Sequence, residues 1–317
     1  MLGQQEELKI CPVTVSLYVI TGAGCNVVIF VTEEGILVVD SGEKPNMAAK
    51  LLTKIQDISS QPIRYLVFTH YHHIVGVEGF PASAMVISHV HTRDSIPLYR
   101  KILSELFEKN IEELKQKARQ WEKDNSAELE KVRIELDLRM KQRESIKQQK
   151  DVLPQMTFNG KMTIYLGGKT VELLSFGPGH TNGDILVYFP EEKVIHVGDL
   201  LYTNGWIPRL DGDAGASVDN WLSIFHRVAA MDVDKIIPGH GEVVEKEGYL
   251  KISQVFSEYL TDLKAEVEKF ISQGASLEET KAKLKLSKYQ HMELAEMLLP
   301  WNIEGVYREI MGSKAKE

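Results

Sequence analysis

The hydrophobic residues of the first hundred positions fall into short, dense runs that turn-forming residues separate. β-Branched runs of this length, bounded by glycine and asparagine, are typical of strands rather than helices. The expected strands are residues 13–21, 27–32, 35–40, 63–68 and 84–90. Among them, residues 46–58 carry Ala48, Leu51, Leu52 and Ile55 on one face, which predicts a helix.

Residues 98–150 follow a different pattern, rich in lysine, glutamate, glutamine and arginine. Hydrophobic positions three and four apart predict two amphipathic helices here, an antiparallel pair broken near residues 124–126. These positions are Leu103, Leu106, Phe107, Ile111, Leu114, Ala118, Trp121, Leu129, Val132, Leu136 and Met140. The pair is compatible with a solvated decoration, a dimer contact or a lid over a site.

The second half of the chain returns to strand patterns and ends in helices. The expected strands are residues 161–166, 170–176, 185–189 and 193–197, with a short strand at "KIIPG". Residues 218–231 have helical spacing, and the tail from Tyr249 is helical until Pro300-Trp301 breaks it once. We therefore expect two halves of one α/β domain (1–97 and 151–248), a helical insertion (98–150) and a C-terminal helical segment (249–317).

Composition and charge remove several functional classes. A chain of 317 residues fits one α/β domain with insertions, and a net charge of −8 disfavours nucleic-acid binding, which needs a clustered basic surface. No apolar stretch has the roughly 20 residues of a membrane span, and the first residues lack a secretory pattern. Cys11 and Cys25 are too few for a disulfide framework, so we expect a cytoplasmic protein with free thiols.

Metal-binding side chains follow several of the predicted strands. The most crowded segment is "FTHYHHIVG", which places three histidines within four positions directly after residues 63–68. Strand ends on one side of an α/β layer meet in space, and histidine is the commonest zinc ligand, so the sequence predicts a metal site. Its candidate ligands are His70, His72, His73, His180, Asp199 and His240.

Taken in order, "GILVVDSG", "THYHH", "GPGHT", "GDLLY" and "PGHG" resemble the metallo-β-lactamase superfamily. The glycine-rich "TGAGCNVV" and the helical insertion further resemble the quinoprotein relay system zinc metallohydrolases. The resemblance spans residue 13 to about residue 245. It implies an α/β fold of the four-layer αββα sandwich type, with a metal cleft at one edge of the two sheets.

The resemblance also implies roles for individual residues. His70, His72 and His180 match the ligands of a first metal, Asp199 the bridging carboxylate, and His240 a ligand of a second metal. Asp199 and His240 are accordingly the expected catalytic residues. Asp40 matches a buried aspartate that supports the metal loops.

One motif departs from the family pattern. The family has His-x-His-x-Asp-His, whereas this chain has "HYHHIV". Without a gap, Ile74 and Val75 replace the aspartate and the last histidine. With a two-residue deletion, which also aligns Gly76 and Phe80, His73 becomes the last histidine. In both alignments the aspartate is missing, so we expect an altered second metal site.

The implied function is a hydrolase with one or two Zn²⁺ per chain, in which metal-activated water attacks an ester, lactone, thioester or amide bond, β-lactams included, of a small molecule. Trp206 and Arg209, on a loop after Asp199, and Tyr71 are the expected substrate contacts. A persulfide dioxygenase that holds Fe²⁺ through two histidines and a carboxylate is one alternative. A binding or assembly module, or a homodimer, using the helical insertion is another.

Overall fold

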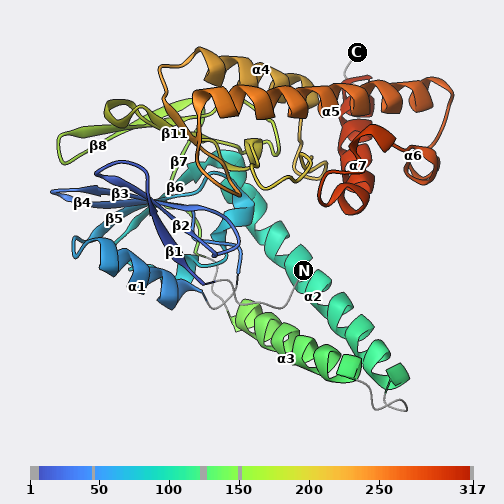
Figure 1. Ribbon diagram of the computed structural model, residues 1–317, viewed down its shortest axis with the longest axis horizontal. Coiled ribbons are helices and arrows are strands. Elements are labelled where there is room, and N and C mark those ends of the chain that lie inside the picture. Colours follow the sequence, from blue (N-terminus) through green and yellow to red (C-terminus); the bar gives the residue numbers. More distant parts are fainter. Residues whose placement is uncertain (1–6, 45–46, 122–126, 149–151, 315–317) are drawn as a thin grey trace.

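The computed structural model describes residues 7–44, 47–121, 127–148 and 152–314. Two mixed β-sheets lie face to face, and helices cover the outer face of each sheet (Figure 1). A pair of long helices extends away from this body. Residues 9–158 build one sheet and residues 161–245 build the other, so the strand Met156–Phe158, which lies within the expected second half (151–248), belongs to the first sheet.

The first sheet has the strand order β1-β2-β3-β4-β5-β6-β7 among the described residues. β1 to β4 pair antiparallel, and β4 to β7 pair parallel, so the loops after β4 and β5 leave the same edge of the sheet. The strands are β1 (Lys9–Pro12), β2 (Leu17–Thr21), β3 (Val27–Thr32), β4 (Gly35–Val39), β5 (Ile63–Val67), β6 (Met85–His89) and β7 (Met156–Phe158).

The second sheet has the order β13-β12-β11-β10-β9-β8 in the described part of the chain. Only β11 and β12 pair parallel in it, and the loops after both strands reach the edge shared with the first sheet. The strands are β8 (Lys161–Leu166), β9 (Lys169–Leu174), β10 (Leu186–Phe189), β11 (Val194–His196), β12 (Lys235–Ile237) and β13 (Val244–Glu245).

Helices connect and cover these strands. The α-helices are α1 (Ala48–Ile58), α2 (Val90–Trp121), α3 (Ala127–Gln148), α4 (Val218–Ala230), α5 (Lys246–Ser272), α6 (Leu277–Lys283) and α7 (Ala295–Lys314). Short 3-10 turns are η1 (Tyr71–Ile74), η2 (Val77–Gly79), η3 (Pro190–Glu192), η4 (Gly198–Leu200) and η5 (Ser287–Tyr289). Two of these turns, η1 and η4, lie in the loops after β5 and β11.

Three buried hydrophobic clusters separate four layers. One lies between the sheets and includes Phe30 and Phe189, whose ring centroids are 5.0 Å apart. A second packs α1 and the start of α2 against the first sheet, with Leu51 and Ile96 fully buried. The third packs α4, α5 and α7 against the second sheet around Trp221. The αββα sandwich expected from the sequence resemblance is confirmed.

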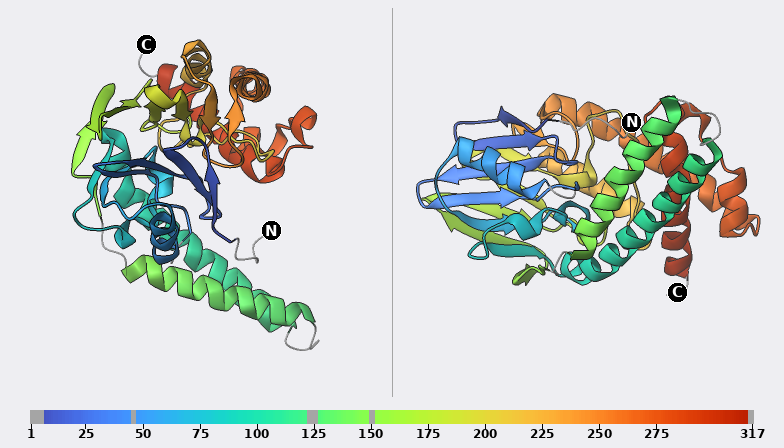
Figure 2. Two further views of the ribbon diagram at one scale, coloured as in Figure 1. Left: turned by 60° about the vertical axis from the view of Figure 1, so that its left-hand side comes forward. Right: turned by 90° about the horizontal axis from the view of Figure 1, so that it is seen from below.

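The helical insertion is a pair of long helices, as expected, but it begins earlier. α2 starts at Val90 rather than at residue 98 and continues through Pro97, because Thr92 and Ile96 are buried against the body and hold its first turns. The two helices lie side by side, and Glu108 of α2 pairs with Arg143 and Lys147 of α3 (Figure 2). The break expected at residues 124–126 lies outside the described residues.

Two other expectations are wrong. Residues 13–21 do not form one strand, because Thr14 Oγ1 accepts hydrogen bonds from the backbone of Ser16 and Leu17 and closes a turn before β2. Pro300 does not break the tail: α7 runs through it from Ala295 to Lys314. A proline inside a helix costs about 3 kcal/mol, and the burial of nearby apolar residues of α7 in the third cluster offsets that cost.

The tail is interrupted elsewhere. Gly274, at φ +78°, ends the turn after α5, and Ser276 begins α6 with a capping box in which its hydroxyl accepts from Glu279 N. Across the described residues, no helix is both long enough and apolar enough to cross a membrane.

Candidate metal centre

Loops from both sheets bring two groups of ligand side chains together at one edge of the sandwich. The loop after β5 supplies the histidines of η1, the loop between β9 and β10 supplies His180, η4 supplies Asp199, and the loop after β12 supplies His240. The loop after β4 supplies Glu43. Within each group, every ligand atom lies within 4.8 Å of the others.

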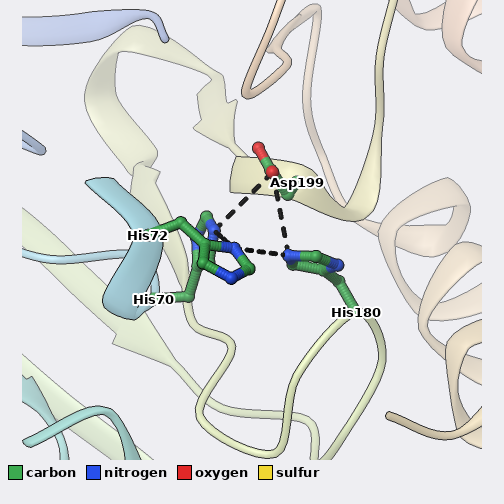
Figure 3. A group of neighbouring side chains, drawn as sticks. All are labelled: His70, His72, His180 and Asp199. Carbon is green, nitrogen blue, oxygen red and sulfur yellow. Dashed lines mark hydrogen bonds and ion pairs between the residues drawn. The ribbon is translucent and has the colours of Figure 1, made fainter. Parts of the chain in front are cut away.

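The first group contains His70, His72, His180 and Asp199, all buried (Figure 3). His72 Nδ1 lies 3.1 Å from His70 Nε2 and 3.0 Å from His180 Nε2. Asp199 Oδ2 lies 3.6 Å from His70 Nε2 and 3.8 Å from His180 Nε2. In a tetrahedral site with bonds of about 2.1 Å, ligand atoms are about 3.4 Å apart. The group therefore has the dimensions of a zinc-sized cage.

The hydrogen bonds behind these imidazoles leave acceptor nitrogens facing one another. His180 Nδ1 donates to the backbone carbonyl of Arg209 at 2.6 Å, so its Nε2 carries no proton in the neutral ring. His72 Nε2 donates to Asp211 at 3.1 Å, which leaves its Nδ1 as the acceptor.

His70 is oriented in the same way. The Thr69 hydroxyl donates to Asp40 at 2.8 Å and accepts from His70 Nδ1 at 3.0 Å, so His70 Nε2 is also an acceptor. Burial, with the nearby His73, holds the pKa of His70 well below its usual value. Burial, with the charge of Arg209, lowers the pKa of His72 to about 3. Three imidazole lone pairs and a carboxylate thus converge on one another, an arrangement that a bound cation would satisfy.

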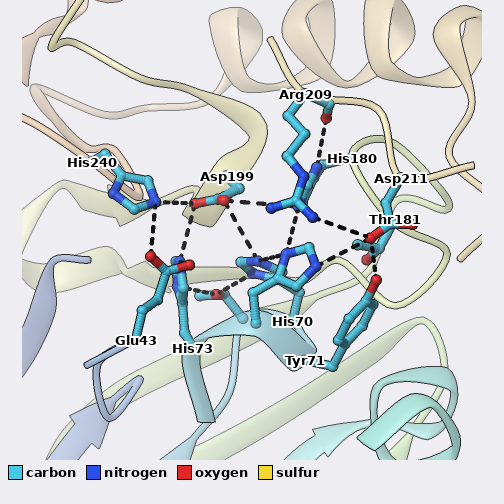
Figure 4. A network of polar contacts seen from close by, with 12 residues as sticks. Glu43, His70, Tyr71, His73, His180, Thr181, Asp199, Arg209, Asp211 and His240 are labelled. Carbon is cyan, nitrogen blue, oxygen red and sulfur yellow. Dashed lines mark hydrogen bonds and ion pairs between the residues drawn. The ribbon is translucent and has the colours of Figure 1, made fainter. Parts of the chain in front are cut away.

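The second group contains Glu43, His73, Asp199 and His240 (Figure 4). Asp199 Oδ1 lies 3.2 Å from His73 Nε2 and 3.4 Å from His240 Nε2. Glu43 lies 3.6 Å from His73 Nε2 and 4.0 Å from His240 Nε2. Both His73 Nε2 and Asp199 Oδ1 are buried without a hydrogen-bond partner. These separations, too, are those of ligands around one ion.

Asp199 belongs to both groups. Its Oδ2 faces the first and its Oδ1 faces the second, which is the arrangement of a bridging carboxylate. Burial alone would raise the pKa of Asp199, but His73, His240 and His70 hold it well below its usual value. Burial likewise would lower the pKa of His240, but Asp199 and Glu43 raise it. The second group therefore stabilises positive charge.

Comparison with known proteins identifies the family. A model described as the metallo-beta-lactamase superfamily matches residues 20–240, well over half of the chain. The chain belongs to the metallo-beta-lactamase superfamily. The two buried groups, consistent with a dinuclear metal site, lie where the family motifs of the sequence are found.

One curated relative and two solved structures illustrate the similarity. The linear primary-alkylsulfatase of Pseudomonas sp. is 22% identical over 275 residues, which cover 80% of this chain and 48% of the relative. The sec-alkylsulfatase structure from Pseudomonas sp. has a TM-score of 0.67 at 15% identity, over 96% of this chain and 50% of that one. A metallo-beta-lactamase from Pontibacter korlensis has a TM-score of 0.53 at 20% identity, over 80% and 99%.

The chain spans about half the length of the linear primary-alkylsulfatase. At these identities the solved structures show a shared fold. The named relatives include alkylsulfatases and β-lactamases, so they support superfamily membership without singling out the quinoprotein-relay group.

The residues of the shortened motif, His73 to Val75, lie in two different environments. His73 points into the second group, as the alignment with a deletion requires, whereas Ile74 and Val75 are buried hydrophobic residues. His73 Nδ1 donates to Asp40 at 2.9 Å, so Asp40 supports both His73 and, through Thr69, His70. These contacts agree with the expectation that Asp40 supports the metal loops.

The three expected substrate contacts lie around the centre in different environments. Trp206 is half-buried, and its ring centroid is 4.8 Å from that of His240. Arg209 is partly exposed beside the first group, 3.8 Å from Asp211. Tyr71 is buried, and its hydroxyl donates to Asp211. Its hydroxyl is therefore engaged within the protein.

Sequence reasoning did not find two carboxylates beside the ligands. Glu43 lies three positions after Asp40 in the loop after β4, so the rule used for the histidines, side chains that follow strands, also applies to it. Asp211 lies in the loop that was singled out for Trp206 and Arg209. Because carboxylates are common in loops, neither had a distinguishing signal without the fold.

Proposed function

We propose that this chain is a metal-dependent hydrolase with a two-ion zinc centre at the shared edge of its sheets. The observation that supports it best is the convergence of proton-free imidazole nitrogens on Asp199, a carboxylate common to both groups. The proposed ligands of the first ion are His70, His72, His180 and Asp199, and those of the second include His73, His240 and Asp199.

The donor set favours zinc over iron. The alternative dioxygenase site would bind iron through His70, His180 and Asp199, and His72 would not be a ligand. Here His72 Nδ1 lies within 3.1 Å of both of the other imidazole nitrogens, so it completes a four-ligand group of nitrogen and oxygen donors. Such a group is typical of Zn²⁺.

Bound zinc would lower the pKa of water toward about 7 and polarise the bond that is cleaved. The chain's own residues would position the reactants. Asp199 is held as a carboxylate and would orient the attacking water, with His240 beside it. Trp206 would offer an apolar surface next to the second group, and Arg209 would attract an anionic part of the substrate near the first.

We infer that the cleaved bond belongs to an ester, lactone, thioester or amide of a small molecule. The similarity to proteins named alkylsulfatases adds sulfate esters to this range, and the similarity to β-lactamases keeps β-lactams within it. Both relatives are hydrolases by name, which supports the reaction type and leaves the substrate to experiment.

A hydrolysis assay tests the proposal. Metal-free protein would be loaded with Zn²⁺ or, without oxygen, with Fe²⁺, and tested on 4-nitrophenyl acetate, 4-nitrophenyl sulfate and a chromogenic cephalosporin. We expect Zn²⁺ to restore hydrolysis of at least one of these substrates, and His180→Ala to abolish it. His226→Ala, at an exposed position of α4, is the matched control and should keep full activity.

Two results would contradict the proposal. Oxygen consumption on a persulfide substrate by the Fe²⁺ form, with no hydrolysis by the Zn²⁺ form, would favour the dioxygenase. A correctly folded protein that binds no metal in excess zinc would favour a binding or assembly module.

A further inference from the structure

The second ligand group lacks the carboxylate that the His-x-His-x-Asp-His motif supplies in the superfamily. Between His70 and Gly76 the loop contains no acidic residue. The two residues after His73 are the hydrophobic residues Ile74 and Val75, which are 2% and 5% exposed. Without another donor, the second ion would have His73, His240 and the shared Asp199 only.

We infer that Glu43, from a different loop, takes the place of the missing aspartate as a ligand of the second ion. This inference rests on the proposed two-ion centre and deepens it. Glu43 Oε1 is 3.6 Å from His73 Nε2, and Oε2 is 4.0 Å from His240 Nε2. Both of its carboxylate oxygens therefore face the space into which the unpartnered His73 Nε2 and Asp199 Oδ1 also point (Figure 4).

Hydrogen bonds fasten the loop of Glu43 to the histidine loop. Ser41 N and Oγ both donate to the His73 carbonyl, at 2.9 and 3.0 Å, and Val75 N donates to the Gly42 carbonyl at 3.1 Å. A side chain on Gly76 would collide with Ser41 O, at 2.2 Å, so glycine permits this contact. These contacts hold the backbone of His73 against the loop that carries Glu43.

The glycine-rich turn before β3 holds Glu43 from the other side. Glu43 N donates to the Ala23 carbonyl at 3.0 Å. A Cβ on Gly24 would lie 2.8 Å from Glu43 Cβ, which leaves no space for a side chain. Gly24 also has φ +101°, a backbone conformation that other residues rarely adopt. The "GAGCN" segment is therefore glycine-rich because the loop of Glu43 packs directly against its backbone.

The charge and the solvent exposure of Glu43 are both consistent with a metal ligand. Glu43 restores a second carboxylate to the centre beside Asp199, so relocation keeps the number of negative ligands that the motif aspartate would give. Its side chain is 29% exposed, whereas those of His73 and Asp199 are 0% and 4% exposed. Glu43 is thus the ligand on the solvent side of the second group, where a substrate would approach.

Zinc binding to the Glu43→Gln variant tests the inference without relying on activity. Metal-free wild type and variant would be titrated with Zn²⁺ against a competing chromophoric chelator, and with Co²⁺ by absorption spectroscopy. Glutamine keeps the size of the side chain and removes its charge. Glu33→Gln, an exposed position in the turn between β3 and β4, is the matched control.

We expect wild type and Glu33→Gln to bind two ions. Glu43→Gln should bind the first ion with affinity near that of wild type and the second ion more than about 100-fold more weakly. This loss of affinity would exceed the roughly 10–100-fold loss that follows from replacing a residue that only supports a ligand. Glu43→Asp should recover part of that affinity.

Two outcomes overturn the inference, and they differ in what they mean. If wild type binds two ions and Glu43→Gln binds both within threefold of wild-type affinity, Glu43 is no ligand, while the two-ion proposal stands. If wild type binds fewer than two ions, the inference fails together with the second site of the proposed function.

Discussion

Hydrogen-bonding partners decide which nitrogen of His70, His72, His73 and His180 faces the centre. Asp40 and Thr69 orient two imidazoles of the histidine loop, Asp211 orients His72, and a backbone carbonyl orients His180. Each partner accepts a hydrogen bond from the ring nitrogen on the far side. The near-side nitrogens consequently present lone pairs, which is the state that a metal ligand requires.

The two ligand groups should respond differently to loss of one imidazole. His180→Ala removes a donor from the first group and should eliminate most bound metal, because the remaining donors of that group lose their tetrahedral arrangement. His73→Ala should weaken only the second ion. Elemental analysis of both variants beside His226→Ala measures this, and unchanged metal content in His180→Ala would show that the first group is misassigned.

Asp211 should matter although it is no proposed ligand. The Asp211→Asn change weakens the acceptor that fixes the His72 tautomer and also meets the Tyr71 hydroxyl. We expect the affinity for the first ion to fall about 10–100-fold, as for other residues behind metal ligands. Chelator competition measures it. Asp213→Asn, at an exposed position of the same loop, should leave the affinity unchanged. Equal effects of the two changes would refute the assignment.

Among the secondary-structure elements, α7 holds the loop that carries Trp206, Arg209 and Asp211. Asn302 of α7 is fully buried; its Oδ1 accepts from Leu210 N and its Nδ2 donates to the Pro208 carbonyl, at 2.8 and 2.7 Å. The C-terminal segment therefore belongs to the site's framework.

Removal of that anchor should cost stability. Asn302→Ala leaves buried backbone groups at Pro208 and Leu210 unpaired, and we expect the free energy of unfolding to fall by about 1–3 kcal/mol for each of them. Urea unfolding measures it, with Gln290→Ala, an exposed position, as control. A change below about 0.5 kcal/mol would show that water replaces the amide.

The sequence predicted most strands and the strand ends that carry the candidate ligands, because buried β-branched runs have a clear pattern. It did not predict the turn at Thr14 or the continuation of α7 through Pro300, since both depend on side-chain hydrogen bonds or tertiary burial. Of the site, the histidines and Asp199 were found through motifs. Glu43 and Asp211 were missed because only the folded chain brings their loops next to the histidines.

In the molecule as a whole, the paired helices α2 and α3 form an arm that leaves the body (Figures 1 and 2). Near the body, Tyr99 of α2 lies 5.0 Å from the rings of Tyr71 and His72, so the base of the arm adjoins the centre. Farther out, the arm exposes several hydrophobic side chains. These are Leu106, Ile134, Leu138 and Met140.

We propose that the arm mediates a homodimer, which would cover these side chains. Light scattering during size-exclusion chromatography should give twice the chain mass of 35.9 kDa, and Ile134→Glu, at a position that is 62% exposed, should shift the mass toward the monomer. A monomeric mass for the unaltered chain at micromolar concentration would exclude the dimer.

The proposed centre joins the two sheets, because the histidine loop comes from one and His180, Asp199 and His240 come from the other. Anomalous diffraction at the zinc absorption edge, from crystals of protein purified with zinc in the medium, tests this most directly. We predict two peaks, one on the Oδ2 side and one on the Oδ1 side of Asp199. Crystals soaked in zinc that show no peak at Asp199, or peaks only elsewhere, would contradict the account.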